Sequence, residues 1–231
     1  MKAMILAAGR GERMRPLTDA CPKPLLQVGG KPLIAWHLER LAGAGFTEVV
    51  INHAWLGARI EAALGDGSRY GLRIRYSLEG RDHGGALETA GGVAKALPLL
   101  TDPSSDCFWV VSGDVFLPGF RFDADLAQRF AQGVALAHLW LVPNAPHHPH
   151  GDFAIDANGL ASRTLEPKLT WASVGLFRAA IVDGVAVGEK LPLTPLLRAG
   201  AEAGRISAQR YDGPWTDVGT VERLNSLNST G

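Results

Sequence analysis

The sequence has few cysteines, no excess of charge of either sign and no long apolar run. Its two cysteines, Cys21 and Cys107, lie far apart without CxxC spacing, which supports neither a disulfide framework nor a zinc site and favours a reducing cytoplasm. Lysine plus arginine number 23 and aspartate plus glutamate 23, and this zero net charge argues against a general nucleic-acid binder. No apolar run approaches the roughly 18 residues of a membrane helix, and the apolar residues 3–8 lead into a glycine loop without a cleavage-like segment. We therefore expect a cytoplasmic protein whose partners are neither nucleic acid nor membrane.

The composition is that of a globular protein with extra glycine. Hydrophobic residues make up 46% and charged residues 20%, so a sizeable core can be buried. Glycine contributes 28 of 231 residues, about 12% against roughly 7% in average proteins, and several of these glycines cluster where ligand loops would lie. The length fits one large α/β domain or two small ones.

The first half of the chain alternates short apolar runs with helical patterns. Strands are predicted at residues 2–8, 47–52, 72–77 and 107–111, helices at 31–44, 60–64 and 88–97, and a glycine-bearing loop at 80–85. This alternation indicates a parallel sheet covered by helices.

The pattern changes after about residue 121. Further strands are predicted at 134–142, 171–177 and 206–211, a hairpin at 152–165 around Asn158-Gly159, a helix at 191–203, and a short polar helix after the segment 215–219. Neither a repeat nor a linker interrupts the chain. We predict one α/β domain with a mixed, mostly parallel, Rossmann-like sheet flanked by helices.

A glycine-arginine loop directly follows the first predicted strand. Residues 6–16 read LAAGRGERMRP, in which the glycines allow backbone N–H groups to approach a ligand and the guanidiniums suit phosphate oxygens. Residues 9–25 carry four positive and two negative side chains within a neutral protein. Neither the Rossmann fingerprint nor the P-loop pattern fits. A solvated arginine-rich turn is the alternative.

A Pro-Lys-Pro segment follows about a dozen residues later. Pro22 and Pro24 restrict the backbone on both sides of Lys23, which reduces the entropy lost when its ammonium is held in place. A lysine between prolines is by itself more often a surface turn. Together with the preceding loop, the segment is far more specific than either motif alone.

These motifs resemble those of the nucleotidyltransferases that make nucleotide-sugars from a sugar 1-phosphate and a nucleoside triphosphate. That family carries Gly-x-Gly-x-Arg-(Met/Leu)-x-Pro and then Pro-Lys-Pro, matched here by residues 9–16 and 22–24. Residues 52–57 (NHAWLG), 87–92 (LETAGG) and 215–220 (WTDVGT) extend the likeness over nearly the whole chain. Within the family, they are most similar to the uridylyltransferases of peptidoglycan sugar recycling.

The resemblance has implications for fold, organisation and substrates. It implies a GT-A-like fold, with a nucleotide-binding part at about 1–121 and a sugar-binding part with a C-terminal elaboration at about 122–231. The implied substrates are UTP and a sugar 1-phosphate, and we expect a monomer or weak homo-oligomer.

The resemblance also implies that two aspartates bind Mg²⁺. Asp114 follows a predicted strand in Ser112-Gly113-Asp114, at the sheet edge where open α/β folds bind ligands. Asp217 lies in the segment 215–220. Because Mg²⁺ prefers oxygen ligands and bridges phosphates, one or two carboxylates suffice. Either aspartate could instead cap a helix or form a turn. Relatives often carry Asn in place of Ser112.

Catalytic and nucleotide-binding residues are carried over from the same resemblance. Arg13 and Lys23 are the catalytic candidates, with Arg13 on the β and γ phosphates and Lys23 on the α and sugar phosphates. The nucleotide-binding candidates are Leu6, Ala8, Gly9, Gly11, Glu12, Arg13, Glu88, Thr89, Gly92, Ser112 and Gly113. Glu88 and Thr89 could instead be first-turn helix residues. Residues 81–85 look like an insertion before this loop.

The second half supplies most of the sugar-binding candidates. They are Lys23, Gly151, Asp152, Glu166, Ser173 and Gly175. Many relatives carry Glu-Lys-Pro, whereas this chain has Glu166-Pro167-Lys168, which displaces the lysine by one residue. Residues 147–150 (HHPH) lack the convergence that zinc requires, and we expect a loop there.

The expected reaction is attack of a sugar 1-phosphate oxygen on the α-phosphorus of UTP, with pyrophosphate leaving in line. The nucleophile is already ionised, so catalysis is mostly positioning and charge neutralisation. One alternative is a mannose-1-phosphate guanylyltransferase with the same phosphate machinery. Another is a catalytically silent nucleotide-sugar binding subunit, against which intact Arg13, Lys23, Asp114 and Asp217 argue.

Overall fold

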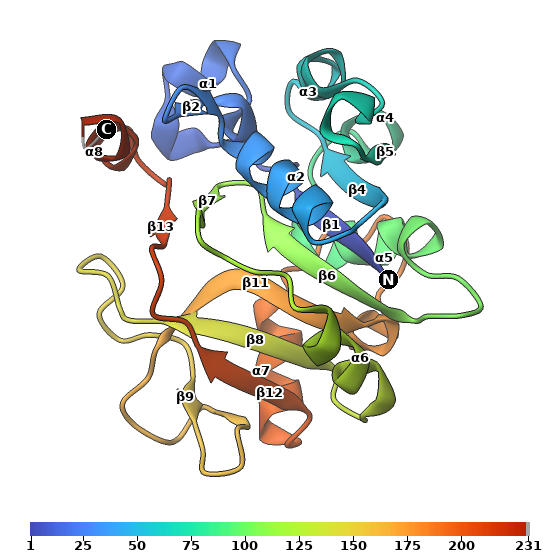
Figure 1. Ribbon diagram of the computed structural model, residues 1–231, viewed down its shortest axis with the longest axis vertical. Coiled ribbons are helices and arrows are strands. Elements are labelled where there is room, and N and C mark those ends of the chain that lie inside the picture. Colours follow the sequence, from blue (N-terminus) through green and yellow to red (C-terminus); the bar gives the residue numbers. More distant parts are fainter. Residues whose placement is uncertain (230–231) are drawn as a thin grey trace.

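Seven strands form one central sheet in the computed structural model, which describes residues 1–229 (Figure 1). Their order across the sheet is β12-β8-β11-β6-β1-β4-β5. The strands are β1 (Lys2–Leu6), β4 (Glu48–His53), β5 (Arg73–Leu78), β6 (Cys107–Ser112), β8 (Ala137–Val142), β11 (Thr170–Arg178) and β12 (Ile206–Arg210). Within this sheet β11 runs antiparallel to β6 and β8, and the other pairings are parallel. The predicted single domain with a mixed, mostly parallel sheet is confirmed.

Helices cover both faces of the sheet. One layer contains α2 (Leu33–Gly43), α3 (Gly57–Leu64) and α6 (Ala124–Gln132), and the other contains α5 (Glu88–Leu100) and α7 (Thr194–Glu202). In β1, Ala3 and Ile5 pack in the first layer and Met4 in the second, and all three are fully buried. A strand covered on both faces needs a continuous apolar run, which is the pattern that identified β1 in the sequence.

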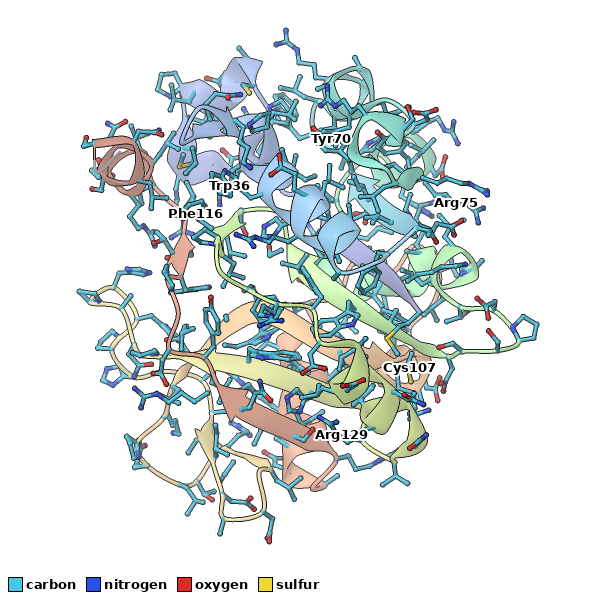
Figure 2. All side chains as sticks on the ribbon, in the orientation of Figure 1. Trp36, Tyr70, Arg75, Cys107, Phe116 and Arg129 are labelled. Atoms are coloured by element: carbon cyan, nitrogen blue, oxygen red, sulfur yellow. The ribbon has the colours of Figure 1, made fainter. Side chains whose placement is uncertain are left out.

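The C-terminal segment crosses back from β12 to the N-terminal half of the molecule (Figure 1). There β13 (Thr216–Asp217) pairs antiparallel with β7 (Val115–Phe116). The last helix, α8 (Val221–Ser229), lies beside the hairpin of β2 (Gln27–Val28) and β3 (Lys31–Pro32), where Asn228 Nδ2 donates to Gln27 O over 2.9 Å. Figure 2 shows Trp36 of α2 beside Phe116 of β7, and their rings meet edge to face at 5.1 Å.

The short elements differ most from the sequence prediction. The loop predicted at 80–85 is present at residues 84–85 but wrong at 80–83, where the structure has helix α4 (Glu79–His83), which ends at Gly84 with φ +74°. A Cβ on Gly80 would lie 2.7 Å from Ala54 O, so this glycine permits close helix packing and does not mark a loop. The predicted hairpin is present with two-residue strands, β9 (Ala154–Ile155) and β10 (Ala161–Ser162).

Several short helices were not predicted. They are η1 (Glu12–Met14), α1 (Leu17–Ala20), η2 (Lys23–Leu25), η3 (Ser68–Tyr70) and η4 (Ala179–Val182). Among residues 1–229, the structure has no helix that is both long and apolar enough to span a bilayer.

Candidate active site

A cavity of about 740 Å³ opens at the carboxyl ends of β1, β4 and β6. Leu6 at the end of β1 is in register with Asn52 of β4 on one side and Ser112 of β6 on the other. This is the sheet edge at which open α/β folds bind ligands. The lining residues are Leu6, Ala7, Ala8, Gly9, Arg10, Glu12, Lys23, Pro24, Asn52, His83, Gly84, Gly85, Ala86, Leu87, Glu88, Thr89, Ser112, Asp114, Gly188 and Lys190.

The loop after β1 forms one wall of the cavity and is braced from behind. Gly11 has a φ of +70°, and its carbonyl oxygen accepts a hydrogen bond of 2.9 Å from Thr18 Oγ1. Thr18 is fully buried, and its own carbonyl accepts from Arg10 Nη1 and from Trp55 Nε1, each over 2.9 Å. The Arg10 guanidinium also stacks on the Trp55 ring at 3.8 Å from the centroid. These contacts hold the loop in one conformation.

Lys23 and Asp114 meet inside the cavity, although 91 residues separate them in sequence. Lys23 Nζ lies 2.5 Å from Asp114 Oδ2, and the two side chains are 11% and 37% exposed. Asp114 Oδ1 accepts a hydrogen bond of 2.6 Å from Ser112 Oγ. Burial alone would raise the pKa of Asp114, but the Lys23 ammonium and the Ser112 hydroxyl outweigh it and hold that pKa below its ordinary value. Asp114 is therefore an ionised carboxylate at neutral pH.

Asp217 lies next to Asp114 along the backbone but has different side-chain partners. Val218 N donates to Asp114 O over 2.9 Å, which joins the two segments. The Asp217 carboxylate does not line the cavity, and it pairs with the Arg223 guanidinium and with His147 Nε2, the latter at 3.0 Å. Nothing in the sequence indicated that His147 lies beside this aspartate.

Asp114 and Asp217 are the residues that could hold a divalent cation. Asp114 directly precedes β7 and Asp217 lies in its partner β13, and both offer hard carboxylate oxygens of the kind that Mg²⁺ or Mn²⁺ prefers. Within the described part of the chain, no larger group of His, Cys, Asp or Glu side chains converges as a metal site. The donor set therefore fits an ion that keeps water or phosphate oxygens as its other ligands.

The loop before α5 and the first turn of that helix form a second wall. Glu88 and Thr89, the first two residues of α5, line the cavity there together with Gly84 and Gly85 of the loop. Glu88 has a φ of +61°, a left-handed conformation that costs a non-glycine residue about 1 kcal/mol. Because surrounding contacts must maintain that conformation, this wall has a defined shape.

Lys190 and His83 line the cavity from segments that the sequence analysis did not assign to the site. Leu191 O accepts a hydrogen bond of 2.9 Å from Ala90 N. This contact holds the segment that contains Lys190 against the start of α5. The ring of His83 packs on Gly188, where a Cβ would lie 2.9 Å from it. Lys190 is exposed, and none of the described residues forms an ion pair or hydrogen bond with its side chain. A glycine beside charged residues, the same signal that marked residues 9–16, could have identified this segment.

The structure brings some predicted nucleotide-binding residues into the cavity and leaves others outside. Those that line it are Leu6, Ala8, Gly9, Glu12, Glu88, Thr89 and Ser112. Arg13 is exposed on η1 outside the lining, whereas its neighbour Arg10 lines the cavity. Gly11 braces the loop from outside the lining. A Cβ on Gly113 would lie 2.9 Å from the carbonyl oxygen at the end of β1, and Gly92 is equally confined, so both glycines serve close packing.

Of the sugar-binding candidates, Lys23 alone lines the cavity in the described structure. Asp152 Oδ2 accepts a hydrogen bond of 2.8 Å from Trp171 N. Glu166 is exposed and accepts from Lys168 N over 3.0 Å, so the displaced lysine lies beside this glutamate. Gly175 is buried in β11, where a Cβ would lie 2.8 Å from a carbonyl oxygen of β8.

The remaining candidates, Gly151 and Ser173, both have left-handed backbones. Their φ values are +60° and +58°. Ser173 lies where the pairing of β11 with β8 shifts register, and Gly151 follows the histidine loop. The sugar candidates of the second half thus gather around β11, outside the lining of the cavity.

Comparison with known proteins places this arrangement among nucleotidyltransferases. A sequence model described as nucleotidyl transferase matches residues 2–230. The chain is 53% identical, over 99% of its length and 97% of the relative's, to N-acetylmuramate alpha-1-phosphate uridylyltransferase of Neisseria meningitidis serogroup B. It is 40% identical, over 95% of its length, to mannose-1-phosphate guanylyltransferase of Mycobacterium tuberculosis, of which it spans 61%.

A solved structure shares the fold. A Bacillus anthracis protein described as a glucose-1-phosphate thymidylyltransferase, in complex with sucrose, superposes with a TM-score of 0.78 at 22% identity. The match covers 100% of this chain and 94% of that one.

Proposed function

This chain belongs to the nucleotidyl transferase family, and we propose that it transfers UMP from UTP to N-acetylmuramate α-1-phosphate, giving a UDP-sugar and pyrophosphate in peptidoglycan sugar recycling. The relative of 53% identity, which is named for this base and this sugar, supports both choices. The observation that carries the proposal is the contact of Lys23 Nζ with Asp114 Oδ2 at 2.5 Å, inside the cavity where β1, β4 and β6 end.

The main obstacle in such a reaction is repulsion between two polyanions. Two unit charges 4 Å apart interact by about 4 kcal/mol near a protein surface, so bound cations must offset the repulsion. Lys23 uses one of its three N–H donors on Asp114 and keeps two for phosphate oxygens. Lys190 brings a second ammonium to the same cavity. A sugar phosphate is already ionised, so these residues position and neutralise the substrates without a general base.

We propose Mg²⁺ as the divalent metal with which this family acts. Asp114 and Asp217 would hold it, and when bound it would neutralise charge on the triphosphate. The lowered pKa of Asp114 keeps its carboxylate ionised, which is the form that binds a cation. Lys23 and Arg223 balance the charge of the two carboxylates in the structure described here.

We further propose that the two parts of the chain bind different substrates. Residues 1–121 would bind the nucleotide, and residues 122–231 would bind the sugar and add the C-terminal elaboration. In support, the cavity lining comes from the first part except for Gly188 and Lys190. We propose that the protein acts as a monomer or weak homo-oligomer in the cytoplasm, where its two free cysteines, Cys21 and Cys107, would stay reduced.

The test is a matrix of nucleoside triphosphates against sugar 1-phosphates with Mg²⁺, scored by pyrophosphate release. UTP, GTP, CTP and dTTP are each combined with the 1-phosphates of N-acetylmuramate, N-acetylglucosamine, glucose and mannose. We expect UTP with N-acetylmuramate 1-phosphate to give the highest kcat/KM, at least roughly tenfold above other pairs, or about 1.4 kcal/mol. A preference for GTP with mannose 1-phosphate would replace the proposal. No pyrophosphate from any pair would indicate a binding subunit.

A further inference from the structure

A buried carboxylate lies behind the nucleotide cavity without lining it. Glu79, the first residue of α4, is 0% exposed. Its Oε1 accepts a hydrogen bond of 2.6 Å from Asn52 Nδ2, and its Oε2 accepts one of 2.8 Å from Leu87 N. Asn52 Oδ1 in turn accepts one of 2.9 Å from Ala7 N. Three hydrogen bonds thus connect the loop after β1 with the loop before α5.

Both ends of this chain of hydrogen bonds adjoin cavity walls. Ala7 precedes Ala8 and Gly9 on one wall, and Leu87 precedes Glu88 on the other. The separation of the two walls is therefore fixed through one amide and one carboxylate side chain.

The donors and acceptors in this chain permit one arrangement. The Asn52 carbonyl oxygen must face the Ala7 N–H, so its amino group must face Glu79. Both partners of Glu79 are donors, so the side chain must accept twice. An ionised carboxylate meets this requirement, whereas a glutamine has one acceptor oxygen and would set an N–H donor against another donor.

Helix α5 packs directly against the two side chains at Gly92. A Cβ on Gly92 of α5 would lie 2.6 Å from Glu79 Oε1 and 2.9 Å from Asn52 Nδ2. Gly92 therefore provides the space in which the carboxylate and the amide meet. Its place in the sequence motif has a packing reason, since it does not line the cavity.

A carboxylate at this buried position is not explained by packing of the apolar core. Burial raises the pKa of Glu79 above its ordinary value, and the hydrogen bonds from Leu87 and Asn52 oppose that rise. The closest cation of α5, Lys95, pairs with Asp82 at 2.6 Å and not with Glu79. The chain therefore keeps a carboxylate that is costly to bury at the point where hydrogen bonds link the two cavity walls.

We infer that Glu79 is a positioning residue that sets the spacing between the phosphate-side loop and the base-side loop, and thereby the selectivity of the cavity among nucleotides. The inference deepens the proposed function and rests on it, because it concerns the site that would bind UTP. Glu79 acts through Asn52 and Leu87 and does not itself line the cavity.

The test compares Glu79→Gln with a matched control, Glu48→Gln. Glu48 is the first residue of β4, the strand that contains Asn52; its side chain is 18% exposed and pairs with Lys2 at 3.2 Å, away from the cavity lining. Calorimetry with UTP, CTP, GTP and dTTP measures nucleotide binding, and turnover gives KM and kcat. For Glu79→Gln we expect the Kd and KM of the preferred nucleotide to rise at least tenfold and its advantage over the others to shrink severalfold. The KM for the sugar 1-phosphate and all values for Glu48→Gln should stay within twofold of wild type.

A second variant perturbs the same hydrogen bonds from the side of α5. Gly92→Ala pushes a methyl group toward Glu79 and Asn52 without entering the cavity, and it should reduce nucleotide selectivity in the same way. If either variant folds and keeps wild-type nucleotide affinities and selectivity, the inference is wrong, even if its melting temperature falls. The same binding measurements distinguish failure of this inference from failure of the proposed function. If the wild-type protein prefers another nucleotide, UTP is not the substrate. The two variants would still show whether Glu79 determines that preference.

Discussion

At the scale of single residues, two lysines of the cavity have different surroundings. Lys23 is tied to Asp114 at 2.5 Å and largely buried, so its position is fixed before substrates arrive. Lys190 is exposed and has no ion-pair or hydrogen-bond partner among the described residues. The Lys190 ammonium is thus free to move toward an incoming phosphate, whereas the Lys23 ammonium is already held in position.

Replacing Lys190 should weaken catalysis without weakening the fold. We expect Lys190→Ala to lower kcat/KM roughly tenfold to hundredfold, because a hydrogen bond to a charged group contributes about 1.5–3 kcal/mol. The melting temperature should not change, since the side chain is exposed. Steady-state kinetics and thermal melts measure both.

Lys168→Ala is the control for this prediction. Lys168 lies beside Glu166 at 3.4 Å and outside the cavity lining, so its loss should change kcat/KM by less than twofold. A large loss from Lys168→Ala with none from Lys190→Ala would mean that the sugar phosphate binds near β11.

Sequence reasoning identified those candidate residues of the cavity that belong to local motifs. Lys23 and the loop of residues 9–16 stand out because their spacing is compact, and Asp114 because it follows a strand. Lys190 and Glu79 were missed because their roles depend on contacts made across the fold. Gly92 was assigned to the ligand, whereas its tight packing on Glu79 is visible only in three dimensions.

At the scale of secondary-structure elements, a buried histidine joins α2 to β7 beside the site. His37 is 2% exposed, and its Nε2 lies 2.9 Å from Val115 O. Burial lowers the pKa of His37 to about 4, because the charged imidazolium would lose its hydration. The ring is therefore neutral in the folded protein at neutral pH.

This histidine should make the fold sensitive to acid. Its folded pKa of about 4 lies below the unfolded value of 6.5, so the unfolded chain binds the proton first as pH falls. The contribution of neutral His37 to the free energy of unfolding is fully present above pH 6.5 and is lost as the pH falls toward 4. Between about pH 7.5 and about pH 5 we expect a loss of about 2 kcal/mol from this group. Urea unfolding at both pH values measures it.

His37→Gln isolates the contribution of the imidazole. Glutamine can donate to Val115 O but does not titrate, so its loss of stability over the same pH interval should be about 2 kcal/mol smaller than that of wild type. Equal losses in the two proteins would show that His37 is not the acid-sensitive group.

Elements with strong periodicity were predictable, and those shaped by packing were not. The strands β1, β4, β5 and β6 were located to within two residues, because burial on both faces leaves a distinct apolar run in β1, β4 and β6, and the edge strand β5 alternates apolar and polar residues. Helix α4 was taken for a loop because its Gly80 suggested a turn, while that glycine lies against Ala54. The strands β7 and β13 have two residues each, too few for any pattern in sequence.

At the scale of the whole molecule, the chain brings its last residues back to its first half. Pairing of β13 with β7 sets Asp217 beside Asp114, and α8 fixes the return against β2 (Figure 1). The family resemblance implied that both aspartates belong to one site, but nothing in the sequence showed their contacts. The sugar candidates around β11 lie beyond the cavity lining, and the second half reaches that lining through Gly188 and Lys190.

In the proposed reaction Lys23, held by the Asp114 carboxylate inside the cavity, neutralises two phosphates that repel each other. The most direct measurement is the turnover of Lys23→Ala with UTP, N-acetylmuramate 1-phosphate and Mg²⁺, beside its thermal melt. We predict a fall in kcat of roughly 10² to 10³, about 3–4 kcal/mol, with a fold that remains cooperative. Turnover close to that of the wild-type enzyme would contradict the account.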